Sequence, residues 1–321
     1  MRESVLRALQ ETRCVSGQEL GEKLRISRTA VWKYVNELRR LGYQIDSSPR
    51  RGYSLTRSAD LLLPEEVGAG LETRFLGKRI LHHAEVTSTQ DIAEELARAG
   101  AEEGLVVIAE GQTRGRGRKG RGWESPAGGG VYLSIVLRPD LIPSLLIQIP
   151  LIAGVAVVRA VRQAAPLEPA LNWPNNIIIG GRKAGGVLTE MSCEIDGVNY
   201  IVLGIGVNIN TPMSLIPEPT RGIATSLAAE CGRHVSRVKF VQKLLSEFET
   251  LYSEFLKSGF ARIREEWKSA NCTLGGRVRV TDGEDEIEGE ALDIDREGFL
   301  LVRKENGDVR RIITGDVTLC A

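Results

Sequence analysis

The stretch GQTRGRGRKGRGW, residues 111–123, has the composition of an anion-binding segment, with five Arg and Lys side chains among glycines. Arg116 and Arg118 carry planar, permanently charged guanidinium groups whose geometry suits phosphate and carboxylate. The backbone can adopt positive φ and approach a ligand closely at its glycines, among them Gly115, Gly117, Gly120 and Gly122. We therefore interpret the stretch as a loop that holds a small anion.

A nucleic-acid-binding Arg/Gly segment is the alternative interpretation of the same residues. Segments of that class are long, repetitive and disordered. This stretch occurs once, lies between the predicted strands 105–109 and 131–137, and ends on an aromatic residue, Trp123. We favour the small-anion loop. The alternative predicts that Arg116→Ala and Arg118→Ala weaken DNA binding even without a ligand.

Four further stretches have the composition of a binding site: TSTQ (87–90), NWPNN (172–176), GGRKAGG (180–186) and GIGVNIN (204–210). Lys183, in the third of them, is predicted to lie in a glycine-flanked turn between two strands. An ammonium group there could neutralise a carboxylate and a phosphate while they are joined. A solvated turn lysine is the alternative, which the neighbouring stretches disfavour.

Length and composition limit what can position these residues. A chain of 321 residues is long enough for two or three domains with a buried core. Because 42 Lys+Arg balance 42 Asp+Glu, any nucleic-acid binding must be local. The five cysteines are far apart and form no CxxC pair, which argues against a structural zinc site and a disulfide framework. A reducing cytoplasm fits this pattern best.

The sequence is expected to be that of a soluble protein without a membrane span. Its N-terminus, MRESVLRALQ, is charged and periodic, unlike the apolar part of a secretion signal. The most apolar stretch, 141–161, is interrupted by two prolines and by polar residues, which favours a buried core helix over a membrane-spanning one.

The first segment, residues 1–60, has the pattern of a winged helix-turn-helix domain. Ser16 followed by Glu19 is typical of a capping box that opens a helix, and Ser27 is expected to cap the next one. The stretches YQID and GYSL flank the turn SSPRR, which predicts two short strands joined by a basic loop. Residues 1–57 contain twelve Lys+Arg and six Asp+Glu, a net charge of +6.

This charge surplus and the wing favour DNA binding over the alternative, a helical protein-interaction module with a basic surface. Duplex phosphates attract such a surface, while a few side chains read base edges. The candidates are Arg28, Thr29, Lys33 and Asn36 on the third helix for the major groove, and Arg50 and Arg51 on the wing for phosphates or the minor groove.

The remaining chain predicts an α+β fold, with a mixed α/β domain at residues 61–270 and a small SH3-like barrel at 271–321. Asn306-Gly307 is a strong hairpin signal within the barrel. Predicted strands of the α/β domain occupy residues 105–109, 131–137, 176–180, 186–191 and 200–209, and its predicted helices occupy 90–98, 145–162 and 238–255.

Together, GQTRGRGRKGRGW, NWPNN, GRKAGG and GIGVNIN, between a winged helix and a small barrel, resemble the bifunctional biotin protein ligase and biotin operon repressor family, BirA. The resemblance covers nearly the full chain; lipoate ligases share the fold but not the Arg/Gly loop. It implies an enzyme that couples biotin and ATP into biotinyl-5′-adenylate and pyrophosphate, with Mg²⁺ accompanying ATP. It also implies transfer of biotin to a lysine of a biotin carboxyl carrier protein, and an adenylate-bound form that dimerises on operator DNA.

The same resemblance assigns expected roles to residues of this chain. Arg118 would clamp the adenylate phosphate and Lys183 would hold the biotin carboxylate and the α-phosphate, which makes these two the expected catalytic residues. No protein nucleophile is needed, because the carboxylate attacks the α-phosphorus and cations already in place supply the stabilisation. The other expected residues are Ser88, Thr89, Gln112, Gly115, Arg116 and Gly186 for biotin, and Trp123, Asn176 and Asn208 for the adenylate.

The chain departs from the family pattern in two stretches. NWPNN stands where the family has Lys-Trp-Pro-Asn-Asp, and TSTQ stands where it has Asp-Ser-Thr-Asn. An Asp at position 176 would orient Mg²⁺·ATP or a basic neighbour, and Asn176 loses that charge. We hypothesise a regulator that binds biotin and adenylate while ligation is slowed or lost, or a paralogue for another small acid. The alternative is an active ligase in which Asn172 and Asn176 are compensated elsewhere in the site.

Overall fold

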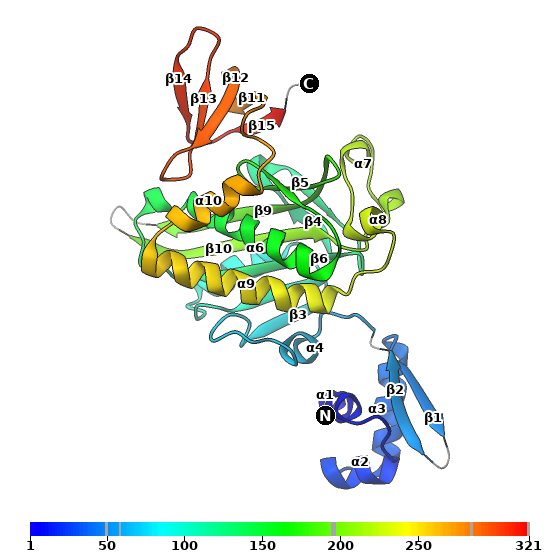
Figure 1. Cartoon of the computed structure of the whole chain (residues 1–321). Helices are drawn as coiled ribbons and strands as arrows, with labels where there is room; N and C mark the ends of the chain where they lie inside the picture. Colours follow the sequence, from blue (N-terminus) through cyan, green and yellow to red (C-terminus); the bar gives the residue numbers. More distant parts are fainter. Residues whose placement is uncertain (49–50, 58, 194–196, 283–284, 320–321) are drawn as a thin grey trace. The chain divides into compact units, whose positions relative to one another are not determined.

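The computed structural model describes residues 1–48, 51–57, 59–193, 197–282 and 285–319 (Figure 1). The chain divides into two compact units, Met1–Glu66 and Val67–Ala321. The short helix α4 (Pro64–Gly68) spans the border between them. The domain boundaries near residues 60 and 270 stay predictions.

The first unit packs three helices against a two-stranded hairpin. The helices are α1 (Arg2–Glu11), α2 (Gly17–Leu24) and α3 (Arg28–Arg40), and the antiparallel strands are β1 (Gln44–Ser48) and β2 (Gly52–Arg57). Their common core includes Val5, Leu6, Leu9, Leu20, Val31, Val35 and Leu38. The predicted helix-turn-helix with a hairpin wing is confirmed.

Side-chain caps fix where α2 and α3 begin. Ser16 Oγ accepts a hydrogen bond from the Glu19 backbone at 3.1 Å, and the Glu19 carboxylate accepts one from the Ser16 backbone at 2.8 Å. Ser27 Oγ accepts from the Ala30 backbone at 3.1 Å. These bonds satisfy N–H groups that the first helical turn leaves without partners. The predicted capping box and the Ser27 cap are therefore confirmed.

The second unit is built on an eight-stranded sheet in the order β3-β4-β6-β10-β9-β8-β7, with β5 paired to β4. β3 and β4 are parallel, and the other neighbouring strands are antiparallel. The strands are β3 (Ile80–Val86), β4 (Val106–Arg116), β5 (Gly122–Ser125), β6 (Gly130–Leu137), β7 (Ala170–Asn172), β8 (Asn176–Ile179), β9 (Arg182–Cys193) and β10 (Val198–Asn208).

Helices cover this sheet with apolar side chains. α5 (Thr89–Arg98) packs its alanines on Val107, Val136 and Val202 of three adjacent strands. The long helices α6 (Gln148–Ala164) and α9 (Arg237–Ser258) lie side by side over the sheet, and α10 (Ala261–Ser269) follows (Figure 1). Two short helices, α7 (Thr220–Ile223) and α8 (Leu227–Cys231), precede α9.

Within the described residues, one apolar helical stretch, Pro143–Ala164, is long enough to cross a membrane by length and composition. Its most apolar window is 78% buried inside the protein. A segment that is covered by its own fold has no apolar surface to offer to lipid, so the stretch serves as a core helix, as predicted.

The C-terminal part of the second unit is a five-stranded antiparallel sheet in the order β14-β13-β12-β11-β15. A turn with Gly307 at φ 88° connects β13 to β14, where Asn306-Gly307 predicted a hairpin. The strands are β11 (Arg277–Asp282), β12 (Asp285–Ile294), β13 (Leu300–Arg303), β14 (Val309–Ile312) and β15 (Asp316–Leu319). The predicted fold class, with a small C-terminal β domain, is confirmed.

Two local predictions are wrong. Much of the stretch 111–123 is strand, because β4 continues to Arg116 and β5 begins at Gly122, so the loop shrinks to a 3₁₀ turn around 118–120. Glycines weaken strands in general, but here a Cβ at Gly115 would lie 2.3 Å from the Trp123 carbonyl oxygen, so glycine is what lets β4 and β5 pair. Lys183 is likewise the second residue of β9 and lies outside the turn at 180–181.

Replacing Gly115 with alanine should disrupt the β4–β5 pairing. We expect Gly115→Ala to lower the free energy of unfolding by about 1–3 kcal/mol, since the added methyl group meets backbone that cannot move aside. Gly122→Ala is the matched control, because the nearest atom to its Cβ is 4.0 Å away. Urea unfolding of the two variants measures the difference, and equal midpoints would contradict this account of Gly115.

Candidate active site

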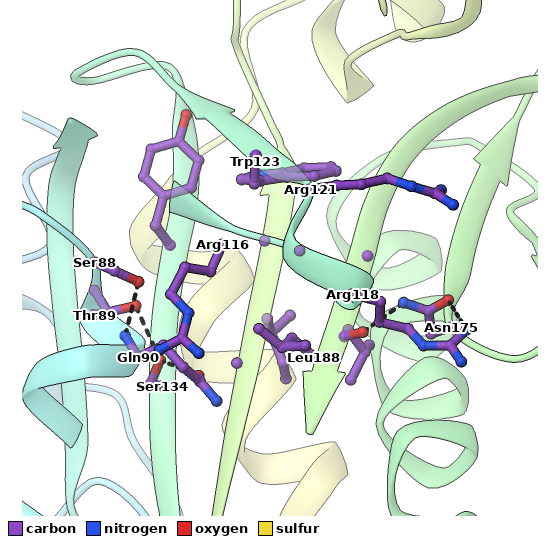
Figure 2. Close-up of a pocket in the computed structure, with 18 of the residues that line it drawn as sticks. Ser88, Thr89, Gln90, Arg116, Arg118, Arg121, Trp123, Ser134, Asn175 and Leu188 are labelled. Atoms are coloured by element: carbon purple, nitrogen blue, oxygen red, sulfur yellow. Dashed lines mark hydrogen bonds between the residues drawn. The ribbon is translucent and has the colours of Figure 1, made fainter. Parts of the chain in front are cut away.

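A pocket in the second unit brings together most of the residues that the sequence selected (Figure 2). It is lined by the start of α5, the 116–123 turn, the hairpin at 175–176, the middle strands of the sheet and one residue of β15, Asp316. The expected residues that line it are Ser88, Thr89, Gln112, Arg116, Arg118, Trp123, Asn176, Lys183 and Gly186.

One end of the pocket is a network of small polar side chains, drawn at the left of Figure 2. Thr89 donates to Gln112 Oε1 through its backbone N–H at 2.9 Å and shares a hydrogen bond with Ser134 Oγ at 2.9 Å. Ser88 Oγ caps α5 by accepting from the Gln90 backbone at 3.2 Å, which places the first turn of the helix beside the network. Fixed donors and acceptors of this kind recognise a compact polar head group.

The network is tied to the sheet on both sides. Gln112 Nε2 donates to Ser125 Oγ at 2.8 Å, Ser134 Oγ donates to Gln90 Oε1 at 3.0 Å, and Gln90 Nε2 donates to the Val202 carbonyl at 2.9 Å. Gln90, Ser125 and Ser134 are buried. Gln90 belongs to the selected TSTQ stretch, where it had no assigned role, whereas Ser125 and Ser134 were missed because their partners lie on elements far apart along the chain.

Glycines of the GIGVNIN stretch make room for the pocket. A Cβ at Gly204 would lie 2.5 Å from Gln90 Oε1, and a Cβ at Gly206 would lie 2.7 Å from Trp123 Nε1. The indole of Trp123 therefore packs directly on the backbone of β10. Its Nε1 is buried and has no hydrogen-bond partner in the described part of the protein, so it is a donor available to a ligand.

Lys183 provides the central positive charge. Its ammonium nitrogen lies 5.4 Å from the centroid of the Trp123 ring. Burial, together with the nearby Arg121 and Arg118, lowers the pKa of Lys183 to about 8, while Asp316 opposes this shift. Because burial disfavours the charged form of Lys183, an anion placed next to the ammonium stabilises that form strongly.

Arg118 and Arg116 differ in how their charges are balanced. Arg116 forms ion pairs with both Asp91, at 2.6 Å, and Glu190. Arg118 donates instead to neutral oxygens, the Gly315 carbonyl at 3.1 Å and Thr314 Oγ1 at 3.4 Å, and burial lowers its pKa. Arg118 is therefore the arginine with charge left for a ligand, whereas Arg116 ties the end of β4 to α5 and β9.

The C-terminal β domain holds the turn between β4 and β5. Asp316 forms an ion pair with Arg121 and lies 3.8 Å from Lys119 Nζ, which also contacts Asp282 at 3.1 Å. Asp316 thus places a carboxylate at the edge of the pocket. Sequence reasoning found no function in this domain, because nothing local marks a contact between residues nearly two hundred positions apart.

The two asparagines at the ends of the NWPNN stretch have different surroundings. Asn172 lies outside the pocket lining: its Oδ1 accepts from Thr273 Oγ1 at 3.1 Å and its Nδ2 donates to the Val317 carbonyl at 3.4 Å. Asn172 therefore bonds the sheet to the C-terminal domain close to Asp316, the residue before Val317. Asn176 does line the pocket, and it pairs directly with Asn172 across the β7–β8 hairpin.

Two further expected residues lie beside the pocket and outside its lining. Gly115 lies in β4 just before the turn, where it permits pairing with β5. Asn208 is buried at the end of β10 and donates to the Thr225 carbonyl at 3.0 Å, while the Thr225 N–H donates to the Lys183 carbonyl at 2.9 Å. Asn208 thereby supports the backbone of Lys183. Asn175, which belongs to the selected NWPNN stretch but had no assigned role, lines the pocket and accepts from Arg118 at 3.5 Å.

The candidate DNA-binding residues belong to the first unit. Arg28, Thr29 and Lys33 are exposed on α3, and Arg51 is exposed at the hairpin turn. Asn36 is half-buried and accepts a hydrogen bond from Arg39 at 3.3 Å. Arg50 lies outside the described residues.

Comparison with known proteins identifies the family. Three family models match, "HTH domain" at residues 2–54, "Biotin/lipoate A/B protein ligase family" at 82–208 and "Biotin protein ligase C terminal domain" at 273–319. The bifunctional ligase/repressor BirA of Bacillus subtilis (strain 168) is 39% identical over 305 residues, covering 95% of this chain and 94% of that protein. The chain belongs to the BirA family.

Other BirA-family proteins and ligases show the same likeness. The bifunctional ligase/repressor BirA of Escherichia coli (strain K12) is 29% identical over 95% of this chain and 92% of that protein. A solved biotin protein ligase from Aquifex aeolicus, in complex with biotin and ATP, is 30% identical with a TM-score of 0.65, covering 76% of this chain and 99% of that chain. The family resemblance found in the sequence is confirmed.

The titration of Lys183 tests the electrostatics of this BirA-family site. We expect its ammonium to be protonated below pH 8 and to lose its proton around pH 8, followed as amine reactivity in competitive labelling across pH. Arg121→Ala should raise this pKa and Asp316→Asn should lower it, because the two groups act on Lys183 with opposite sign. A pKa that neither variant moves would contradict the charge arrangement.

Proposed function

We propose that this chain is a biotin–[biotin carboxyl carrier protein] ligase that also represses transcription in response to biotin. The observation that carries the proposal is one pocket, in a BirA-family chain, with a fixed polar network at one end and the buried cations Lys183 and Arg118 at the other. The polar network suits a ureido head group, and the cations suit a carboxylate joined to a phosphate.

The ligation proceeds in two displacements. A carboxylate oxygen of biotin attacks the α-phosphorus of ATP, the bond to pyrophosphate breaks, and biotinyl-5′-adenylate forms. The acceptor lysine amine of the carrier protein then attacks the acyl carbon, the bond to AMP breaks, and an amide results. We assign Lys183 to the carboxylate and α-phosphate and Arg118 to the phosphate; since both line the pocket, both cations are in place before negative charge develops.

Binding of these anions also stabilises the charged form of Lys183. The pKa of about 8 places the titration of this lysine just above neutral pH. A phosphate or carboxylate beside it favours the charged form, so the ligand raises the pKa and the lysine is fully protonated in the complex. The packing of Lys183 on Trp123 keeps the ammonium in position and shields it from water.

Mg²⁺ would enter with ATP. No cluster of three or more His, Cys, Asp or Glu side chains that could hold a metal is found in the described segments. The pocket does offer oxygen ligands, Asp316 and the side-chain amide oxygen of Asn176, which suit a hard cation held mostly by phosphate. Held there with ATP, Mg²⁺ would supply charge neutralisation at the phosphates, which would make pyrophosphate a better leaving group.

The repressor role rests on the first unit. Its helix-turn-helix, its hairpin and the net charge of +6 over residues 1–57 suit duplex DNA, with Arg28, Thr29 and Lys33 exposed on α3. The adenylate-bound form dimerises on operator DNA, so two copies of α3 meet two half-sites. Ordering of the ligand-binding turn couples biotin supply to this assembly.

The impaired-ligase hypothesis now depends on Asn176 alone. Asn172 bonds to the C-terminal domain and does not line the pocket. The two positions are also directly opposed in the hairpin, so a Lys and an Asp there would be cross-strand partners and their joint replacement leaves the net charge unchanged. This favours an active ligase.

The purified protein should release pyrophosphate from ATP in the presence of biotin and should label a carrier-protein lysine. We expect Lys183→Ala to lower kcat/KM for pyrophosphate release on the order of a hundredfold. The variant lacks the ammonium group that stabilises negative charge as it develops in the transition state. Arg182→Ala is the matched control, because this adjacent cation pairs with Glu230 at 2.7 Å and does not line the pocket.

The departures from the family pattern are tested in the same assay. We expect neither Asn176→Asp nor Asn172→Lys to raise the rate of pyrophosphate release by more than about threefold. A ligase that is already active has no lost charge contact for these changes to restore. A rise of tenfold or more in either variant, from a nearly inactive native protein, would establish the impaired ligase. Full activity of the native protein would exclude it.

A further inference from the structure

Trp32 is a large apolar side chain that the first unit leaves in solvent. It lies within α3 and 58% of its surface is exposed, while its sequence neighbour Val31 is fully buried. Among the described residues of this unit, the other exposed large hydrophobic side chains are Met1 and Leu41, which lie at helix ends. Trp32 is therefore an exposed aromatic in a helix interior, where packing does not require it.

The position of Trp32 places it among the candidate DNA contacts. Arg28 lies one turn before it and Asn36 one turn after it, and Thr29 is three residues away. Side chains three or four residues apart on a helix lie on the same side. Trp32 thus stands inside the row of polar residues that α3 presents, in the N-terminal half of the helix from which major-groove contacts come.

The surroundings point to duplex DNA as the partner. A net charge of +6 over residues 1–57 attracts a polyanion, and Lys33 and Arg51 are exposed for phosphate contacts. An indole cannot accept a hydrogen bond and offers mainly an apolar face. In the major groove the apolar group that bases present is the C5-methyl of thymine. The major groove of A-form RNA is too deep and narrow for such a helix.

We propose that Trp32 is a sequence-reading residue, whose indole packs against the C5-methyl group of a thymine in the major groove. The proposal rests on the DNA-binding part of the proposed function and deepens it, since it names the base chemistry that α3 selects. Phosphate contacts from Lys33 and Arg51 hold α3 in the groove, while Trp32 and the polar residues beside it on α3 contact the base edges.

The first test needs no variant of the protein. The intact chain, with biotin, ATP and Mg²⁺, is used to select a duplex from a random-sequence pool, and each thymine of that duplex is then replaced by deoxyuracil, which removes only the methyl group. We expect affinity to fall about fourfold at one thymine in each half-site, the factor for one buried methyl group. No loss at any thymine would overturn the proposal.

Variants then assign the effect to the residue. Trp32→Ala should weaken binding on the order of tenfold and leave the slope of affinity against salt unchanged, because no phosphate contact is lost. The deoxyuracil replacement should have no further effect in Trp32→Ala, since the partner of the methyl group is gone. Leu41→Ala is the matched control, an exposed apolar residue at the C-terminal end of α3, and should bind as the native chain does.

The outcomes distinguish failure of the DNA-binding function from failure of the role proposed for Trp32. If the native chain selects no duplex, the DNA-binding function and this proposal fail together. If it selects a duplex but Trp32→Ala binds it as tightly as the native chain, DNA binding stands and Trp32 serves a protein contact instead. Equal cost of deoxyuracil in the native chain and in Trp32→Ala would also overturn the assignment.

Discussion

The site depends on holding positive charges close together in a partly buried pocket. Lys183, Arg118 and Arg121 all line it, and burial with mutual repulsion lowers the pKa of Lys183 to about 8. Such an arrangement is unfavourable unless carboxylates or ligands balance it. In this chain Asp316 and Asp282 of the C-terminal domain supply part of the balance, so the pocket depends on contacts with that domain.

That requirement explains several distant contacts. Asn172 holds Thr273 and the Val317 carbonyl, which keeps β15 against the sheet edge and Asp316 beside Arg121. Asn208 holds Thr225, which in turn bonds the Lys183 backbone. Neither side chain lines the pocket, yet each sets where a charge lies. Residues that look like ligand contacts in sequence can therefore act as supports for the residues that bind.

The sequence predicted what local chemistry determines. Caps, the wing hairpin, the buried strands and the identity of Arg118 and Lys183 followed from residue types and from a family resemblance. It could not predict that β4 runs through its glycines, because the pairing depends on the close approach of Trp123, or that Asp316 reaches the pocket from another domain. Trp32 received no role from the sequence, and its exposure became evident only from the packing of α3.

Calorimetric titration with a stable analogue of biotinyl-5′-adenylate, compared with biotin alone and AMP alone, tests the central claim that the cations are arranged for a carboxylic–phosphoric anhydride. The account predicts that the analogue binds at least a hundredfold more tightly than either half, an effect of joining two fragments that the same site holds. It also predicts that Lys183→Ala removes most of this gain. An analogue that binds no more tightly than biotin alone would contradict the account.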